Sequence, residues 1–236
     1  MAFYWEKNQY TRPDNNTNTK TIQDIIKTTL RDRQLCLFSA SISENTLALA
    51  QSFMKEPVIL KTADTVEMNP NISHYYLKGD KRDKFELLRK LIAAEEPQRA
   101  LIFVNQNDSM QEIAEKLNYH QKETFMMRGN IKKEERKRAL DSFRSGKIKL
   151  LISSDLTARG LDIPEVTHII HLDCPANPHE YLHRAGRTAR GNASGKSICI
   201  ITDKDLSTLK KYQKKFNIYF EEMRVSHGKF IPASSN

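Results

Sequence analysis

From residue 72 onward, short apolar segments alternate with amphipathic ones, and this alternation constrains the fold more than any other feature of the sequence. Short apolar runs are typical of buried strands, and apolar residues at helical spacing are typical of helices that cover a sheet. Such repeated strand–helix units predict the α/β class with a doubly wound parallel sheet. The predicted strands are residues 73–77, 100–104, 124–127, 149–152, 166–172 and 197–202. The predicted helices are residues 80–93, 109–117, 132–143 and a segment that ends at residue 211.

The residues before this alternation follow a different pattern. Residues 1–20 are polar and rich in Asn and Thr, so we expect them to be weakly ordered. Ser41 and Glu44 have the spacing of a capping box, as do Ser109 and Glu112. Each pair therefore predicts the start of a helix. In the first part of the chain the predicted elements are a helix at 22–30, a strand at 34–38 and a helix at 47–53.

The boundaries of the predicted sheet domain follow from composition. Residues 56–70 carry a proline near each end and polar residues in their second half, which is typical of a linker. We therefore expect the sheet domain to occupy residues 71–222 and to be followed by a tail at 223–236. Residues 1–55 would then belong to a different structural unit.

A polar stretch follows one of the predicted strands directly. Residues 153–162 read Ser-Ser-Asp-Leu-Thr-Ala-Arg-Gly-Leu-Asp and come after the apolar run Leu-Leu-Ile. In parallel α/β sheets, ligands bind at the carboxyl ends of the strands. This stretch is therefore a candidate site.

A second stretch is dense in arginine. His183, Arg184, Arg187 and Arg190 lie within eight residues, and the Asn-Pro pair at 177–178 predicts an N-cap followed by the first turn of a short helix. Because Arg184 and Arg187 share roughly one helical face, we expect two or three guanidinium groups to converge on one multiply charged anion, with phosphate the natural candidate. The alternative is a solvated basic helix end that the helix dipole stabilises.

The two stretches together resemble, almost residue for residue, the Thr-Asp-x-x-Ala-Arg-Gly-x-Asp and His-Arg-x-Gly-Arg-x-x-Arg motifs of DEAD-box RNA helicases, in the order and about the spacing of that family. Ser-Ala-Ser at 39–41 resembles the family's Ser-Ala-Thr element, which closes the first of two helicase domains. The resemblance implies a RecA-like C-terminal helicase domain. It also implies that residues 1–55 are the end of an N-terminal domain.

The resemblance assigns roles at the nucleotide. ATP and Mg would be bound mainly by the N-terminal domain, and Arg187 and Arg190 would act as arginine fingers on the γ-phosphate. Asp162 would accept a hydrogen bond from the ribose, and Gly160 would allow close approach. The residues that would couple the two domains are Ser39, Ser41, Asp155, Arg159, His183 and Arg184.

The resemblance also implies an RNA surface that contacts the sugar-phosphate backbone and reads no base sequence. Gln106 stands where the family has threonine, and Lys133 where it has glutamine. The charged run around Arg136 is otherwise typical of a solvated helix face. The predicted RNA contacts are Asn105, Gln106, Gly129, Arg136 and Ser154.

The sequence contains neither a Gly-x-x-x-x-Gly-Lys-Ser/Thr phosphate loop nor an Asp-Glu-Ala-Asp segment. Residues 191–197, Gly-Asn-Ala-Ser-Gly-Lys-Ser, have three residues between their glycines and precede a predicted strand, so we interpret them as a turn. This excludes a phosphate-loop nucleotide kinase. We expect the chain alone to hydrolyse no ATP and to need the N-terminal helicase domain as a partner. The alternative is a non-catalytic RNA-binding or regulatory protein on the same fold.

Composition agrees with a nucleic-acid partner. The chain has 38 Lys and Arg against 29 Asp and Glu, which favours a polyanion. Its three cysteines are far apart and show no metal-binding spacing, so they are expected to be reduced, as in cytoplasmic proteins. No apolar run approaches the roughly 20 residues of a membrane span. We therefore expect a cytoplasmic protein that does not interact with membranes.

Overall fold

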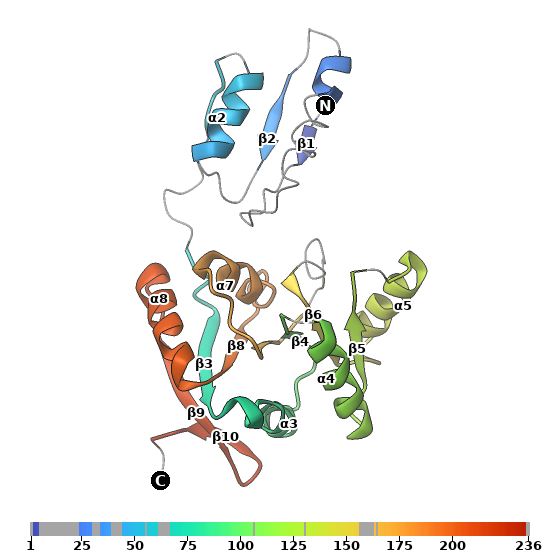
Figure 1. The fold of residues 1–236 in the computed structure, drawn as a ribbon, viewed down its shortest axis with the longest axis vertical. Helices are drawn as coiled ribbons and strands as arrows, with labels where there is room; N and C mark the ends of the chain where they lie inside the picture. Colours follow the sequence, from blue (N-terminus) through green and yellow to red (C-terminus); the bar gives the residue numbers. More distant parts are fainter. Residues whose placement is uncertain are drawn as a thin grey trace. The chain divides into compact units, whose positions relative to one another are not determined.

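The computed structural model describes residues 2–4, 24–29, 34–38, 44–54, 56–60, 67–105, 107–129, 131–155, 163 and 165–234. The chain divides into two compact units, residues 1–66 and 67–236 (Figure 1).

The first unit contains a small parallel sheet and a helix. β1 (Ala2–Tyr4) pairs with β2 (Cys36–Phe38), and α2 spans Glu44–Phe53. The predicted strand and the second predicted helix of this region are confirmed, although the helix begins three residues earlier than predicted. Residues 2–4 form a strand within the segment that we expected to be weakly ordered.

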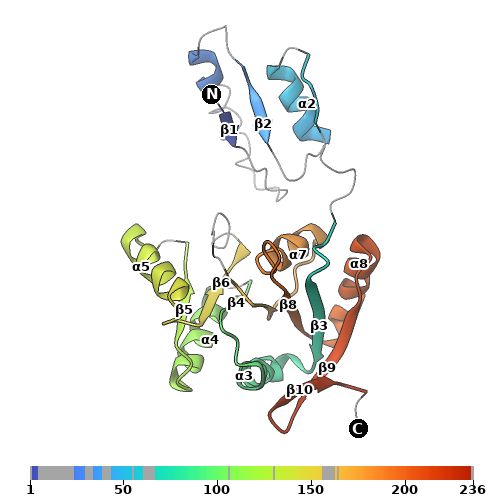
Figure 2. The ribbon, with the colours of Figure 1, turned by 180° about the vertical axis from the view of Figure 1, so that it is seen from behind.

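The second unit is built on an eight-stranded sheet in the order β10-β9-β3-β8-β7-β4-β6-β5 (Figures 1 and 2). All neighbouring strands are parallel except β9 and β10. This mostly parallel sheet confirms the predicted fold class. Its strands are β3 (Ile72–Lys78), β4 (Ala100–Phe103), β5 (Thr124–Met127), β6 (Leu150–Ser153), β7 (His168–His171), β8 (Gly195–Ile201), β9 (Phe220–Ser226) and β10 (Lys229–Pro232).

Helices cover both faces of this sheet because successive strand residues point to opposite faces. Ile102 and Ile200 pack with α3 and α4 in one apolar cluster. On the other face, Cys199 and Ile201 pack with α7 and α8, and Leu101 packs with α5. The helices are α3 (Lys84–Glu95), α4 (Asn107–Tyr119), α5 (Lys133–Arg144), α7 (Pro178–Ala185) and α8 (Leu206–Phe216), and the 3-10 helices are η1 (Lys81–Asp83) and η2 (Asp203–Asp205).

Two boundaries differ from the sequence prediction. α4 begins at Asn107, so Ser109 lies inside the helix and is not its N-cap. The predicted tail at 223–236 contains most of β9 and all of β10. His227 and Gly228 both have positive φ angles, 51° and 71°, as the tight turn of a hairpin requires, and Met223 is buried against the core. The sheet therefore continues past residue 222.

None of the helices in the described parts of the chain is both long enough and apolar enough to span a membrane.

Candidate functional site at the carboxyl edge of the sheet

Three neighbouring strands end together. Phe103 of β4 is in register with Ser153 of β6 and with His171 of β7. Because these strands are parallel, Asn105 and Asp155, each two residues further along the chain, emerge at the same edge. The structure thus brings together two of the stretches that the sequence singled out.

α7 starts as the sequence predicted, but it ends before Arg187, which the sequence reasoning had placed on the same helix. The Asn177 side chain accepts a hydrogen bond from the backbone N–H of His179 at 2.9 Å, and Pro178 occupies the first turn. The helix ends at Ala185, and Gly186 N–H donates to the carbonyl of Leu182 at 2.8 Å. This short helix lies across the carboxyl edge.

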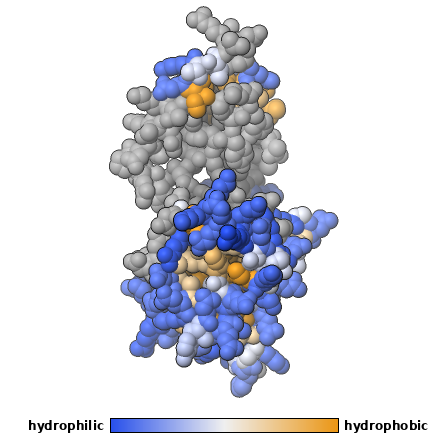
Figure 3. Space-filling model, turned by 90° about the vertical axis from the view of Figure 1, so that its right-hand side faces the viewer, coloured by the Kyte–Doolittle hydropathy of each residue, from blue (hydrophilic) through white to orange (hydrophobic). Residues whose placement is uncertain are grey.

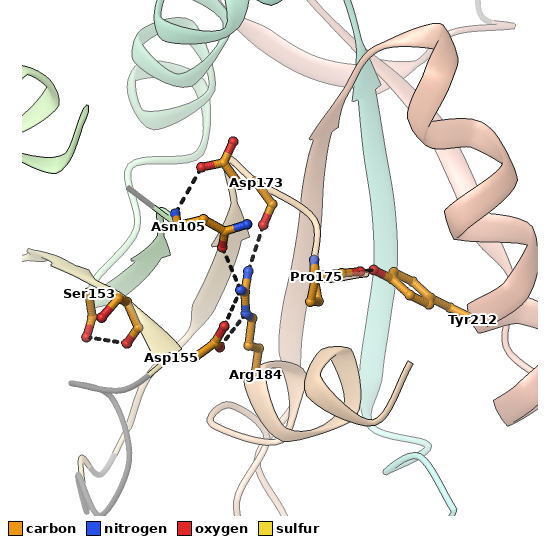
Figure 4. Close-up of polar contacts among 8 residues, drawn as sticks. Asn105, Ser153, Asp155, Asp173, Pro175, Arg184 and Tyr212 are labelled. Carbon is orange, nitrogen blue, oxygen red and sulfur yellow. Dashed lines mark hydrogen bonds and ion pairs between the residues drawn. The ribbon is translucent and has the colours of Figure 1, made fainter. Parts of the chain in front are cut away.

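Arg184 is the hub of the site and is only 2% exposed (Figure 4). Its guanidinium grips the Asp155 carboxylate with two hydrogen bonds, one of them 2.6 Å long. It also donates to the carbonyl of Asp173 at 2.6 Å and to Oδ1 of Asn105 at 2.9 Å. The charge lies 4.8 Å from the centre of the Phe103 ring, close enough for a cation–π contact.

This arrangement corrects one expectation. Arg184 and Arg187 were predicted to converge on one anion, but Arg184 makes four hydrogen bonds within the domain. A buried guanidinium needs such a set of acceptors, because an unpaired buried charge is very unfavourable. Arg184 therefore joins the ends of β4, β6 and β7, and within this unit Asp155 is its partner.

The segment after α7 holds the other two arginines around a buried pair. Thr188 and Ala189 are each 2% exposed, whereas Arg187 is half-buried and Arg190 is exposed. The Thr188 hydroxyl donates to the carbonyl of Val166, and the Asn69 side chain donates to the carbonyl of Ala189 at 2.6 Å. Thr188 and Ala189 thus fix the backbone from which Arg187 and Arg190 extend.

Gly195 makes room for that segment. A Cβ atom on Gly195 would lie 2.1 Å from Oγ1 of Thr188 and 2.9 Å from its Cβ. The first residue of β8 therefore has to be glycine for Thr188 to keep its place. Residues 191–194 before it form a turn that enters β8, as predicted.

Behind Arg184, α7 is tied to the sheet by a buried polar chain. His74 Nδ1 lies 2.6 Å from the Tyr181 hydroxyl, which lies 3.0 Å from the Ser197 hydroxyl, and this in turn lies 3.0 Å from Nε2 of His171. Burial lowers the pKa of His74 to about 4. Burial, followed by the charge of Arg184, also lowers the pKa of His171 well below its ordinary value. Both imidazoles are therefore neutral at pH 7.

The predicted RNA contacts lie on or near this edge, with α5 to one side. Asn105 and Gly129 are exposed, and Ser154 is half-buried after β6. Arg136 is half-buried on α5, whereas its neighbours Glu135 and Lys137 are exposed as a solvated face would be. Figure 3 shows the side of the second unit on which α5 and β5 lie, where hydrophilic side chains surround a smaller apolar area.

Some predicted site residues fall outside the parts of the chain that the structure describes. These are Ser39, Ser41, Gln106, Arg159, Gly160 and Asp162. His183 is described, and it is exposed on α7.

Among the described residues, no three His, Cys, Asp or Glu side chains gather as metal ligands would. Positive charge is supplied by Arg187 and Arg190, which flank a segment held by buried contacts with residues at the amino ends of β3, β7 and β8. The donors of this site suit phosphate groups.

Sequence reasoning missed several residues that build the site. Asp173 accepts the backbone N–H of Asn105 at 3.0 Å, and its place just after β7 is the same signal that identified Asp155. The Tyr181–Ser197 contact and the Thr188–Gly195 packing join residues from different elements. No local pattern marks such pairs.

Residues 83–192 match the family model of the helicase conserved C-terminal domain. The chain is 39% identical over 210 residues to the probable ATP-dependent RNA helicase YfmL of Bacillus subtilis. The aligned region covers 89% of this chain and 55% of that protein. It therefore spans about half the length of the curated relatives it matches.

Solved structures agree with this match. A structure of the C-terminal domain of the DEAD-box protein Dbp5 superimposes with a TM-score of 0.61 at 31% identity, over 64% of this chain and 89% of that domain. Saccharomyces cerevisiae Dbp5 bound to RNA and ADP BeF3 superimposes with a TM-score of 0.75 at 28% identity, over 86% of this chain and 54% of that chain.

Proposed function

Because the chain belongs to the DEAD-box RNA helicase family and carries its RecA-like C-terminal domain, we propose that it is the C-terminal half of an ATP-dependent RNA helicase. In this function the carboxyl edge of the sheet binds the RNA backbone. Arg187 and Arg190 act as arginine fingers on ATP that is held mainly by an N-terminal domain together with Mg. The observation that carries the proposal is a contrast between the arginines near the end of α7. Arg184 makes its hydrogen bonds within the domain, whereas Arg187 and Arg190 extend from a backbone that buried contacts hold in place.

The chemistry of these arginines follows from their form. A γ-phosphate in transfer spreads negative charge over its equatorial oxygens, and a planar guanidinium can meet two of these oxygens at once. Thr188 and Ala189 hold the backbone between the two arginines, so their placement is set before ATP arrives. Gly160 and Asp162 would contact the nucleotide from the segment after β6.

The RNA surface has the character of a backbone reader. Gly129 can let a phosphate approach the chain closely, and Arg136 adds positive charge on α5. Asn105 and Ser154 contribute polar groups from neighbouring strand ends, with Gln106 beside them in sequence. Since none of these residues forms a platform for bases, binding would be independent of base sequence.

The coupling between ATP and RNA would run through residues near both surfaces. Asp155 and Arg184 sit at the junction of three strand ends, and His183 is exposed beside them. Ser39, Ser41 and Arg159 would complete this connection to the N-terminal domain.

The test measures ATP hydrolysis and RNA binding in the same preparations. The chain alone should hydrolyse no ATP with or without RNA, and the chain joined to the N-terminal helicase domain of a relative should show RNA-stimulated turnover. RNA-stimulated hydrolysis by the chain alone, or none by the joined protein, would contradict the proposal.

A second candidate on the same fold is a non-catalytic RNA-binding or regulatory protein. The joined protein would then bind RNA but show no RNA-stimulated turnover. Both candidates predict salt-sensitive RNA binding, in which Arg136→Ala reduces the slope of log K against log salt by about 0.7 to 0.9.

A further inference from the structure

One helix of the second unit presents an unusual concentration of unpaired positive charge. Lys210, Lys211, Lys214 and Lys215 of α8 are all exposed. At 100° per residue these four positions fall on one side of the helix. From residue 206 to residue 219 the sequence contains no acidic residue. We call these four side chains the lysine face.

The opposite side of α8 fixes the helix in place. Leu209, Tyr212 and Phe216 are buried. The Tyr212 ring stacks on Tyr181 of α7 with centroids 4.5 Å apart, and its hydroxyl donates to the carbonyl of Pro175. The lysine face is therefore held rigidly relative to α7, although it contributes nothing to the core.

Several other surface lysines of this unit pair with carboxylates. Lys78 pairs with Asp203 at 2.6 Å, Lys116 pairs with Glu112, and Lys90 lies 3.7 Å from Glu86. Within the described parts of the chain, no carboxylate pairs with any member of the lysine face. The charge of Lys215 does reach α7, where burial and then this charge lower the pKa of His179. Four unpaired cations on one rigid helix create a local positive potential that attracts a polyanion.

We propose that the lysine face is a second RNA-binding site, which holds phosphates of the same RNA strand or duplex outside the carboxyl-edge site. The proposal rests on the proposed RNA binding of this chain. Among possible polyanions RNA is favoured because the rest of the domain already presents a surface for it. A single RNA molecule that binds both surfaces also gains from effective concentration.

The distance between the two surfaces sets the length of RNA that is needed. In Figures 1 and 2, α5 and α8 lie toward opposite ends of the second unit. α8 packs near β3, whereas α5 packs near β6 and β5. In the sheet order, β6 lies four strands from β3 and β5 lies five strands from β3. At about 4.8 Å per strand this is roughly 20 Å. That span corresponds to roughly six nucleotides at 3.4 Å each.

An exposed aromatic side chain stands next to the lysine face. Tyr219 follows Lys215 by four residues and is 74% exposed. An exposed ring beside phosphate-binding lysines is the combination that single-strand binders use to stack a base. Tyr219 would therefore favour single-stranded RNA over duplex at this site.

The test compares RNA binding of the full chain with that of two charge-matched variants. In the first, Lys210, Lys211, Lys214 and Lys215 are all changed to Gln. In the control, Lys90, Lys122, Lys147 and Lys149 are changed to Gln, which removes the same charge away from α8 and from the predicted RNA contacts. Binding is measured with a three-nucleotide and a twenty-four-nucleotide RNA across a salt series, and folding is checked by thermal unfolding.

We expect the α8 variant to bind the long RNA roughly tenfold or more weakly at low salt and to lower its salt slope by about 2 to 3. Binding of the short RNA should change much less, and the control variant should resemble the unaltered chain. Tyr219→Ala should weaken binding of long single-stranded RNA but not of duplex.

Equal weakening by the two lysine variants would overturn the proposal, since only net charge would then matter. So would an α8 variant that binds the long RNA like the unaltered chain while Arg136→Ala weakens binding, and in that case the proposed function would stand. If neither Arg136→Ala nor the α8 variant affects binding, the RNA surface itself is wrongly assigned. Loss of binding to an acidic peptide in the α8 variant, without loss of RNA binding, would identify the lysine face as a protein contact.

Discussion

The buried side of α7 and the segment that follows the helix contain the same residue type in opposite settings. Arg184 is 2% exposed and spends its hydrogen bonds on Asp155, Asn105 and Asp173. Arg187, three residues later, is half-buried, and Arg190 is exposed. Arg184 therefore joins the carboxyl ends of β4, β6 and β7. Arg187 and Arg190 instead flank a segment that is held by residues at the amino ends of β3, β7 and β8. Residue type alone does not decide the role of an arginine, because burial and the nearest acceptors do.

The largest effect should come from substitutions of Arg187 and Arg190. In the chain joined to an N-terminal helicase domain, Arg187→Lys or Arg190→Lys should reduce RNA-stimulated ATP turnover by roughly 10³-fold or more, the range of arginine fingers. An ammonium keeps the charge but loses the two-pronged contact with phosphate oxygens. Steady-state ATPase assays and RNA affinity without nucleotide are measured together.

Arg82→Lys is the matched control, since its side chain is 84% exposed on η1 away from the site. It should leave turnover and RNA affinity unchanged. If the Lys variants at 187 and 190 keep their turnover and lose only RNA affinity, the two arginines form a basic RNA contact and are not fingers.

The buried Arg184 should instead affect the stability of the fold. Arg184→Met leaves the Asp155 carboxylate without its main partner, and Asp155→Asn leaves a buried guanidinium without its counter-charge. Each should lower the free energy of unfolding by about 3 to 5 kcal/mol, because the remaining buried charge is uncompensated. The Asp155 carboxylate that Arg184→Met leaves unpaired is 30% exposed, so Arg184→Met should fall at the lower end. Urea unfolding measures both, with Arg82→Met, whose side chain is 84% exposed, as the control that changes stability by less than about 1 kcal/mol.

The sequence was sufficient to predict what depends on local pattern. The six strands from β3 to β8 and the α/β class followed from apolar runs, and the start of α7 followed from Asn177 and Pro178. That Asn105 and Asp155 emerge at the same edge of the sheet followed from strand ends alone. Each of these features is set by residues close together in the chain.

The rest depends on contacts between distant residues. Arg184 binds Asn105, which lies 79 positions earlier in the chain. The position of Arg184 on its helix suggested an anion shared with Arg187, because no local pattern shows that its acceptors come from distant strand ends. β9 and β10 escaped prediction because their segments mix charged and apolar residues. Met223 is buried only through packing against the core of the sheet domain.

The stability of the fold should also depend on pH, because His74 and His171, which lie beneath α7, are held neutral. The pKa of His74 is lowered to about 4 from an ordinary value of 6.5. Between these values the unfolded chain binds more protons than the folded one, so stability should fall as pH drops from 6.5 to 4. The full loss from His74 is about 3 kcal/mol at 1.36 kcal/mol per unit.

His74→Gln removes this contribution, so its stability should vary less steeply between pH 6 and pH 4.5 than that of the unaltered chain. The difference in slope should approach one proton. A dependence from His171 remains, since its pKa is also lowered by burial and by Arg184. Identical slopes for the two proteins in urea unfolding would show that His74 already titrates normally in the folded state.

The smallest predicted effect tests the contact between Gly195 and Thr188. In Gly195→Ala the new methyl group would overlap Thr188, whose Oγ1 would lie 2.1 Å away, and the branched Thr188 side chain has no flexible end that could move aside. We expect a loss of about 1 to 3 kcal/mol of stability, as for other overpacked sites. Because Thr188 sits between Arg187 and Arg190, turnover of the joined protein should fall as well. Adding Thr188→Ala removes the contacts with Oγ1 and Cγ2 and leaves only the 2.9 Å contact with Cβ. Gly195→Ala should then cost less stability than it does alone, and such a double-mutant cycle isolates the contact. If the two substitutions are additive, the glycine does not position this segment, and the placement of Arg187 and Arg190 must depend on the buried side of α7 alone.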